Sequence, residues 1–420
     1  MRGMRDVLLP MQIIGLRVDQ AERTATIERL KTEEARAQMA WDAVSGATNP
    51  RSYPQMRALL YEKWGLPVQW RREKGHNDRI STDNEAIETL LHETNDLSIS
   101  EGLKILQILK RVQHWRTTYA EIGDRIYPRY GPAKKDDADG KRYAGMAATL
   151  RIIAKGGWNP DGTKTPPIQQ YPQEMKAVIV PDRGAFATLD WKQQELRILA
   201  YMSGDANLIH HIERSIDVFA ELEEILKCDR TRAKNVFYGG VAYGGSAETV
   251  ARELRRHGYA VTNAEVAAQI TRCIALFPGV PRWHNRLLDS ATSRRYIEGP
   301  GGGRRYIYSR EKRYNEILNW PIQYAGAYML WSRLSEFRES IRTHGGDLAI
   351  LQHDSITADF PPERALEGAT ALRLIMERSY PAIHPNFMCP VTVKIGPNWR
   401  DTKEVSGAAI ERDPKESGVL

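Results

Sequence analysis

Two short apolar segments that each carry an aspartate constrain this chain more than any other feature. The segment at 185–190 (AFATLD) is typical of a strand ending at Asp190, and the segment at 347–360 (DLAILQHDSITADF) predicts strand, tight turn and strand around Asp354. The two aspartates are 164 positions apart, so only the fold can bring their carboxylates together. Each aspartate alone also has a plain explanation, as a helix N-cap or as a turn residue.

The chemistry available to such a pair is phosphoryl transfer. Two adjacent carboxylates could hold a pair of Mg²⁺ ions, which activate a nucleophile and stabilise a leaving oxygen. A third segment, DRTRAKNVFYGGVAYGGS, places Arg230, Lys234 and Tyr238 at successive i,i+4 positions, near one helix face. Two cations and a ring suit a triphosphate-bearing nucleotide. A solvated basic helix face is the alternative.

Composition narrows the class of protein without naming a reaction. The formal net charge of +7 and the pI near 9.1 favour a polyanionic partner, nucleic acid first. Three widely spaced cysteines without a CxxC argue against a disulfide scaffold and a structural zinc site, and suit a reducing compartment. No apolar run of 18 residues predicts a membrane span, and the N-terminal apolar stretch is too short for a convincing signal peptide.

Hydrophobic periodicity predicts a mostly helical first part with a basic tip, followed by mixed helices and strands. Thr82 and Glu85 have the spacing of a capping box that opens the helix EAIETLLHE. A Gly cluster interrupts an otherwise helical middle. The expected elements are helices at 21–45, 56–66, 100–122 and 193–204, a hairpin-like stretch at 70–85 and a last strand in 391–399.

Together these segments resemble motifs A, B and C of the family A DNA polymerases, the bacterial DNA polymerase I class and its phage relatives. The motif A counterpart is DWKQQELR at 190–197, that of motif B is Arg230, Lys234, Tyr238 and Gly239, and that of motif C is His353-Asp354-Ser355. Further stretches follow in family order over roughly residues 5–400: RTTY at 116–119, PIQQYP at 167–172, GRRY at 303–306, NWPIQ at 319–323 and KIGPNW at 394–399.

The resemblance implies an α+β right-hand polymerase fold, with an antiparallel β-sheet palm, helical fingers and a helical thumb. The expected divisions are palm start 1–20, thumb 21–140, palm with motif A 141–205, fingers with motif B 206–315, palm with motif C 316–400 and a flexible tail 401–420.

The resemblance also implies roles for individual residues. Asp190 and Asp354, assisted by the backbone carbonyl of Trp191, would hold two Mg²⁺ ions, with Mn²⁺ as a substitute. Lys234 would bind triphosphate and supply a proton to the leaving group, and Glu195 would be the steric gate against a 2′-hydroxyl. The other implied nucleotide-binding residues are Arg230, Tyr238, Gln193 and Tyr243, and the implied primer-template contacts are His353, Asn319, Gln323, Arg116 and Arg304.

Several departures from the family pattern yield predictions of their own. Tyr243 is nine residues after Lys234, where the family has eight, which on a regular helix would turn it about 100° further. We expect the Gly239-Gly240 pair to absorb the extra residue as a π-bulge or break. Ser355 replaces the usual Glu of motif C, and Phe219 stands where many members have His. No Thr-Gly-Arg precedes PPIQQYP, and Lys155 and Lys164 are alternative substitutes.

The expected activity is template-directed addition of dNTPs to a primer 3′-hydroxyl, without a proofreading exonuclease domain in this chain. A separate exonuclease or processivity factor is an expected partner, no membrane is expected, and the expected location is the cytoplasm of a bacterium or phage-infected cell. The alternatives are a single-subunit RNA polymerase, against which Glu195 argues, and a non-catalytic DNA-binding protein. Basic side chains expected to face DNA phosphates are Arg71, Arg72, Lys74, Arg79, Lys110, Arg111, Arg116, Arg230 and Lys234.

Overall fold

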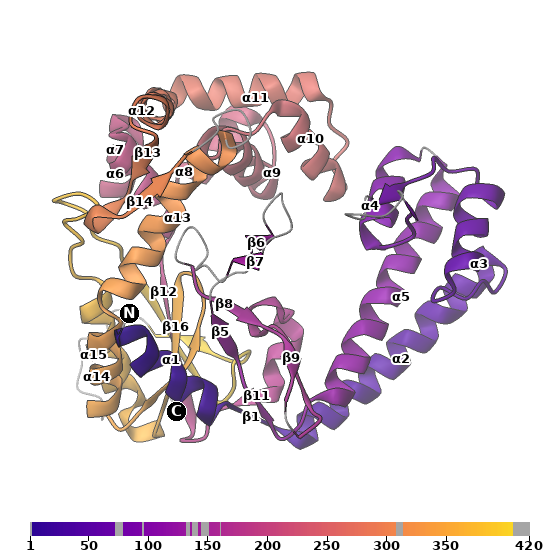
Figure 1. The fold of residues 1–420 in the computed structure, drawn as a ribbon, viewed down its shortest axis with the longest axis horizontal. Coiled ribbons are helices and arrows are strands. Elements are labelled where there is room, and N and C mark those ends of the chain that lie inside the picture. The colour runs from indigo at the N-terminus through magenta and orange to yellow at the C-terminus, as the bar shows by residue number, and fades with distance from the viewer. Residues whose placement is uncertain are drawn as a thin grey trace. The chain divides into compact units, whose positions relative to one another are not determined.

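The described residues divide into two compact units, shown in the ribbon of Figure 1. The computed structural model describes residues 2–71, 79–94, 96–131, 135–136, 142–143, 151–159, 161–307 and 314–405. Unit 1 comprises Met1–Asp19, Gly123–Leu254 and Ala260–Leu420, and unit 2 comprises Gln20–Ile122 with the short segment Arg255–Tyr259. The α+β class expected from the sequence is confirmed.

A five-stranded antiparallel sheet forms the centre of unit 1 and brings the two aspartate-bearing segments together. The strand order is β15-β16-β12-β17-β18, so the motif A strand lies between the motif C hairpin and the last long strand. Six residue pairs join β12 to β16, from Ala185 opposite Phe360 to Asp190 opposite Ser355. The strands are β12 Ala185–Trp191, β15 Asp347–Leu351, β16 Ser355–Phe360, β17 Val391–Gly396 and β18 Lys403–Glu404.

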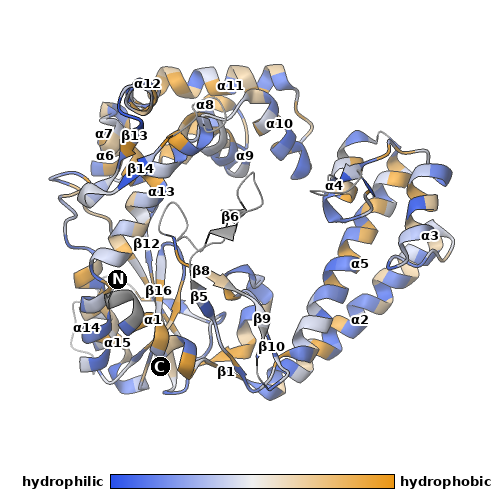
Figure 2. Ribbon diagram, in the orientation of Figure 1, coloured by the Kyte–Doolittle hydropathy of each residue, from blue (hydrophilic) through white to orange (hydrophobic). Residues whose placement is uncertain are grey.

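Successive side chains of β12 point to opposite faces of the sheet, so that the face with Trp191 packs against a helix and the other face carries Asp190. Ala187, Leu189 and Trp191 share one face, and Trp191 packs against Phe337 of helix α14 (Leu334–Thr343). Asp190 points to the opposite face. Helix α15 (Pro362–Met376) also packs on this sheet, and Figure 2 shows apolar colour along β12 and β16.

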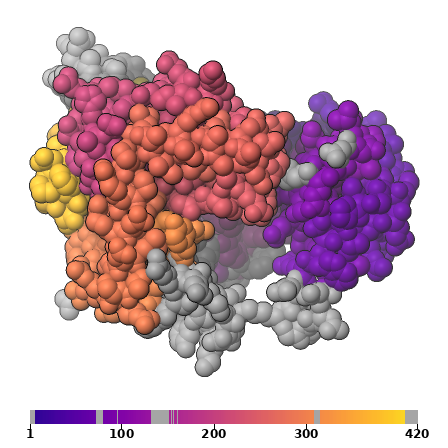
Figure 3. Space-filling view, turned by 90° about the horizontal axis from the view of Figure 1, so that it is seen from above, coloured from indigo at the N-terminus to yellow at the C-terminus, as the bar shows by residue number. Residues whose placement is uncertain are grey.

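The helices of the middle segment form a layer at the top of unit 1 in Figure 1, which Figure 3 views from above. Their starts follow ordinary capping chemistry: Asp205, Asp217 and Asp229 each accept hydrogen bonds from backbone N–H groups of the first turn. The elements are α6 Gln194–Ser203, α7 Ala206–Glu213, α8 Val218–Leu226, α9 Arg230–Asn235, π-helix η4 Val236–Ala242, α10 Ala247–Arg256, α11 Asn263–Leu276, α12 Gly279–Ser293 and α13 Tyr314–Ser332.

Smaller elements complete unit 1. Within the expected tail 401–420, Lys403–Glu404 pairs with β17, and residues 406–420 lie outside the described residues. The elements are α1 Arg2–Ile14, 3₁₀ turns at Ile168–Gln170, Gln173–Val178 and Pro300–Gly302, and short paired strands: β1 Leu16–Val18 with β4 Arg125–Ile126 and β11 Ile179–Val180, β5 Arg129–Gly131 with β8 Ile153–Lys155, β6 Lys135–Asp136 with β7 Arg142–Tyr143, β9 Gly157–Trp158 with β10 Lys164–Thr165, and β13 Tyr296–Glu298 with β14 Arg304–Tyr306.

Unit 2 is helical, as predicted, and its core lies between two long helices. Trp41 of α2 and Leu103, Leu106 and Leu109 of α5 are buried in one apolar cluster. Figure 2 shows the mixed hydropathy of both helices, whose apolar side chains face inward. The elements are α2 Gln20–Ser45, α3 Tyr53–Arg57, a π-helical stretch Ala58–Lys63, α4 Asn84–Glu93, α5 Leu97–Glu121, and the hairpin β2 Trp70–Arg71 with β3 Arg79–Ile80.

The predicted capping box of Thr82 and Glu85 is wrong by one residue. Asp83 is the N-cap of α4, and its carboxylate accepts a hydrogen bond from the backbone N–H of Ala86. An ionised carboxylate is at least as good a cap as a threonine hydroxyl.

Some basic side chains of unit 2 already have internal partners. Arg71 forms an ion pair with Asp83, Arg79 lies over the Tyr53 ring, and Lys110 Nζ donates to a backbone carbonyl. Burial lowers the pKa of Lys110. Arg72 and Lys74 lie outside the described residues. Contact of this surface with DNA stays a prediction.

Candidate active site

The fold places Asp190 and Asp354 at the same edge of the central sheet. Asp190 is the penultimate residue of β12 and lies opposite Ser355, the first residue of β16. Asp354 sits in the turn just before β16, and its carbonyl accepts a hydrogen bond of 3.1 Å from the backbone N–H of Trp191. Two residues 164 positions apart in sequence thus become neighbours, as the family resemblance implies.

The electrostatics of this pair favour a bound cation. Burial raises the pKa of Asp190 to about 7, with the neighbouring Asp354 adding to the rise and Lys394 opposing it. Within the described ranges no set of three His, Cys, Asp or Glu side chains surrounds a common metal position. Ser355, which stands where the family has Glu, is buried, and its hydroxyl hydrogen-bonds to the side-chain oxygen of Gln352.

The side chain of Trp191 anchors the end of β12. Its indole is buried, its Nε1 donates to the Met376 carbonyl at 3.1 Å, and its ring contacts Phe337 and Tyr380. This packing fixes the strand end that carries Asp190.

A sharp turn between β12 and α6 separates Asp190 from Glu195. Gln193 has a left-handed backbone conformation (φ 51°), which is uncommon for a non-glycine residue, and helix α6 begins immediately after it. Glu195 therefore lies in the first turn of α6.

Arg230 and Lys234 share a face of α9, as their spacing predicted. Both lie over the ring of Phe219, with 5.6 Å from the Arg230 guanidinium carbon and 5.4 Å from Lys234 Nζ to its centroid. Arg230 also pairs with Asp217 at 2.8 Å. Phe219, at the position where many family members have His, therefore contacts both cations through its ring.

The structure confirms the expected π-helical segment, which absorbs the extra residue between Lys234 and Tyr243. Residues Val236–Ala242 form a π-helix, and the N–H of Tyr243 donates to the carbonyl of Tyr238, five residues earlier. The Tyr238 and Tyr243 rings consequently lie 6.2 Å apart on the same side. Gly240 permits close packing, because a Cβ there would be 2.5 Å from Ile270.

Glu195 links motif A to motif B through its carboxylate. Its Oε2 accepts a hydrogen bond from the Tyr243 hydroxyl, and its Oε1 forms an ion pair with Arg151. Sequence reasoning missed Arg151, which precedes β8. The only available signal was a cation in the segment where the family's Thr-Gly-Arg is absent. Lys155 and Lys164 were the alternative substitutes expected there, and Arg151 was not among them.

The five predicted primer-template residues have different surroundings. The pKa of His353 is lowered, first by burial and then by the charge of Arg151. Asn319 and Gln323 are four residues apart on α13, and Asn319 Oδ1 is buried without a hydrogen-bond partner among the described residues. Arg304 pairs with Glu298 in the β13–β14 hairpin, and Arg116 pairs with Glu34 between α5 and α2.

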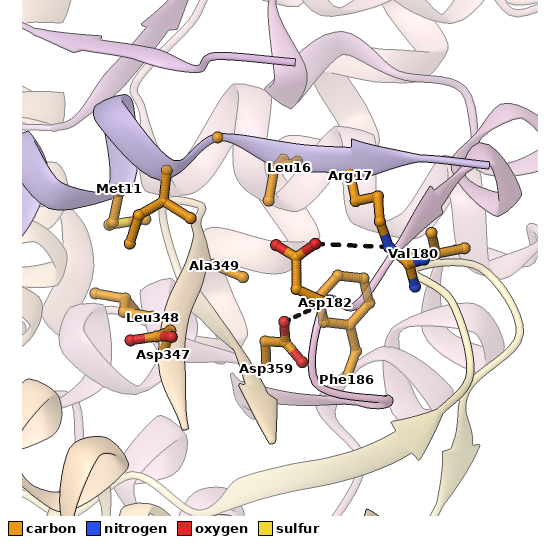
Figure 4. A pocket seen from close by; sticks show the side chains of 12 residues that line it. Met11, Leu16, Arg17, Val180, Asp182, Phe186, Asp347, Leu348, Ala349 and Asp359 are labelled. Atoms are coloured by element: carbon orange, nitrogen blue, oxygen red, sulfur yellow. Dashed lines mark hydrogen bonds and ion pairs between the residues drawn. The ribbon is translucent and has the colours of Figure 1, made fainter. Parts of the chain in front are cut away.

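A small pocket lies at the other end of β12, beside Phe186, and is shown in Figure 4. Its volume of about 20 Å³ suits a single water rather than a nucleotide. Asp359 beside it accepts hydrogen bonds from the backbone N–H groups of Asp182 and Arg183. Burial raises the pKa of Asp359 to about 6. These contacts clamp a turn, so the pocket is structural.

Comparison with known proteins identifies relatives of this arrangement. The family model described as DNA polymerase family A matches residues 20–401. The thermostable DNA polymerase I of Thermus aquaticus is 28% identical over 424 residues, covering 96% of this chain and 48% of the relative. A thermostable DNA polymerase I of Thermus thermophilus is 27% identical over 418 residues, covering 94% and 47%. The chain thus spans about half the length of these curated relatives.

A solved structure supports the fold. The POL domain of Pol1 from M. smegmatis, in complex with DNA primer-template and dNTP, superposes with a TM-score of 0.76 at 21% identity, covering 95% of this chain and 70% of that one. Among the described helices, none has the length and apolarity of a membrane span.

Proposed function

The chain belongs to DNA polymerase family A, and from this membership we propose that it adds deoxynucleotides to a primer 3′-hydroxyl under the direction of a DNA template. The observation that carries the proposal is the carboxylate pair, with Asp190 on the central strand and Asp354 tied to that strand by the Trp191 N–H. Primer-template DNA and dNTPs, the ligands of the structurally similar POL domain, are the proposed partners.

Asp190 and Asp354 fit divalent cations, because burial and the neighbouring Asp354 raise the cost of charging Asp190 in the absence of a counter-ion. We assign two Mg²⁺ ions to them, with the Trp191 carbonyl as a further ligand and Mn²⁺ as a substitute. Bound there, the ions would supply Lewis-acid activation of the primer hydroxyl and charge neutralisation at the leaving pyrophosphate.

Motif B would bind the incoming nucleotide. Lys234 and Arg230, both at the Phe219 ring, are the proposed triphosphate ligands, and Lys234 would donate a proton to the leaving group. Tyr238 would stack near sugar and base, with Tyr243 and Gln193 completing the pocket. Glu195 would exclude a 2′-hydroxyl, which makes deoxynucleotides the preferred substrates.

The surrounding fold would present primer and template to this site. His353 would contact the primer end, and Asn319 and Gln323 the minor groove, where acceptor positions are shared by all base pairs. Arg304 and Arg116 are weaker proposals, since acidic partners hold both. The central sheet would be the palm, the middle helices the fingers and unit 2 the thumb.

Primer extension on templates that offer each of the four bases tests this function. We expect addition of the complementary dNTP, dependent on Mg²⁺, with ribonucleotides added far more slowly. Preferred addition of ribonucleotides would indicate an RNA polymerase. DNA binding without any nucleotide addition, with Mg²⁺ or Mn²⁺, would indicate a non-catalytic DNA-binding protein.

A further inference from the structure

We propose that Arg151 is a positioning residue for sugar discrimination, which acts by holding the Glu195 carboxylate in place. The inference rests on the proposed polymerase function, because it concerns how one class of nucleotide is rejected. Arg151 belongs to none of the three motifs that carry the family resemblance, and its partner Glu195 lies 44 residues later in the chain.

The two oxygens of Glu195 are held by different elements. The Arg151 guanidinium pairs with Oε1 from the segment before β8, and the Tyr243 hydroxyl donates to Oε2 from the end of the π-helix. Side-chain exposures of 22% for Arg151 and 27% for Glu195 place the pair partly out of water, where a charge-assisted hydrogen bond is stronger than at the surface.

The backbone next to Arg151 is itself anchored. The Gln169 side chain accepts a hydrogen bond from the Ala154 N–H at 3.0 Å and donates to the Ile152 carbonyl at 3.1 Å. Ile152 is buried, and Tyr130, opposite Ala154 on the paired strand β5, accepts a hydrogen bond at its hydroxyl from the Leu351 N–H at the end of β15. Arg151 therefore approaches Glu195 from a segment tied to the motif C hairpin.

A carboxylate held at both oxygens is a rigid obstacle, whereas one held at a single oxygen can rotate away or accept a hydrogen bond from a 2′-hydroxyl. The positive charge of the guanidinium also compensates the negative charge of Glu195. This matters because the triphosphate and the primer would add negative charge close by. Loss of Arg151 should therefore admit ribonucleotides more easily without removing the groups that perform the chemistry.

Single-nucleotide incorporation by the full chain measures this directly, as the ratio of kcat/KM for a dNTP to kcat/KM for the matching rNTP. We expect Arg151→Gln to lower this ratio roughly tenfold, the effect of losing one charge-assisted contact, and Arg151→Lys to restore part of it. Arg129→Gln removes an exposed arginine from neighbouring β5 and should leave the ratio unchanged. Thermal unfolding of each variant verifies that it is folded.

A double-mutant cycle separates action through Glu195 from any other role. In a Glu195→Ala background, Arg151→Gln should cause no further loss of discrimination. An equal loss for both nucleotides with an unchanged ratio, or an effect that persists without Glu195, would overturn the inference and would point to a direct contact of Arg151 with nucleic acid. If the unmodified chain adds neither nucleotide, the proposed function itself fails.

Discussion

Replacing Asp190 by asparagine should stabilise the metal-free protein at pH 8, although the same change removes a proposed metal ligand. Burial and Asp354 raise the pKa of Asp190 to about 7, so at pH 8 the folded chain carries an unfavourable charge there. A rise from the ordinary value near 4 corresponds to roughly 4 kcal/mol, and the access of this side chain to water reduces this to about 1–2 kcal/mol.

The sign of the effect depends on pH in a defined way. The folded pKa of Asp190 lies above the unfolded one, so its contribution to stability is fully present below about pH 4 and is lost as the pH rises through 7. Asparagine is neutral throughout. The variant should therefore gain roughly 1–2 °C in Tm at pH 8 and much less at pH 5, where the native side chain is already protonated.

Thermal unfolding in EDTA at pH 5 and pH 8 measures this gain. The exposed Asp289 on α12 provides a matched control, and Asp289→Asn should show no comparable pH-dependent difference. Adding Mg²⁺ at pH 8 should stabilise the unmodified protein more than Asp190→Asn and so reduce the gain. A lower Tm for Asp190→Asn at pH 8 without metal would refute the charge-repulsion argument.

Three other substitutions have opposite or independent expected effects. Lys394→Met removes a charge that lowers the pKa of Asp190, so the acid limb of the pH–rate profile for nucleotide addition should move to higher pH; an unmoved limb would contradict this. Asp359→Asn should destabilise by about 1–3 kcal/mol in denaturant unfolding, despite its raised pKa, because it weakens the acceptor for the backbone N–H groups of Asp182 and Arg183; a gain in stability would show that charge, not hydrogen bonding, dominates there. Gly240→Ala should cost about 1–3 kcal/mol by the same measurement, since its Cβ would meet Ile270 at 2.5 Å, and a neutral result would mean that the helices yield.

Secondary-structure elements that depend on a local residue pattern were predictable from the sequence. The strands around Asp190 and Asp354 follow from apolar runs that end in polar turns, whereas their pairing in one sheet was implied only by the family resemblance. The π-helix before Tyr243 followed from a single extra residue beside two glycines. The strand predictions rest on the local apolar pattern, and the π-helix prediction rests on the spacing of Tyr243 from Lys234.

Features that depend on packing between distant segments were not predictable in the same way. Arg151 was not selected from the sequence, because a cation in the segment before PPIQQYP does not reveal that it meets a carboxylate 44 residues away. Asp359 looked like the end of a strand, and its burial against a turn emerges only from the sheet. The cap of α4 was assigned to Thr82 because the spacing fitted, while the neighbouring Asp83 makes the bond.

The most direct test of the central claim is the rate of single-nucleotide addition by Asp190→Asn and by Asp354→Asn, measured on a primed template with saturating Mg²⁺ and matched dNTP. Both variants should lose at least about a hundredfold in rate while still binding primer-template, and Asp289→Asn should keep the unmodified rate. Addition at the unmodified rate by either aspartate variant would contradict the assignment of this pair as the catalytic centre.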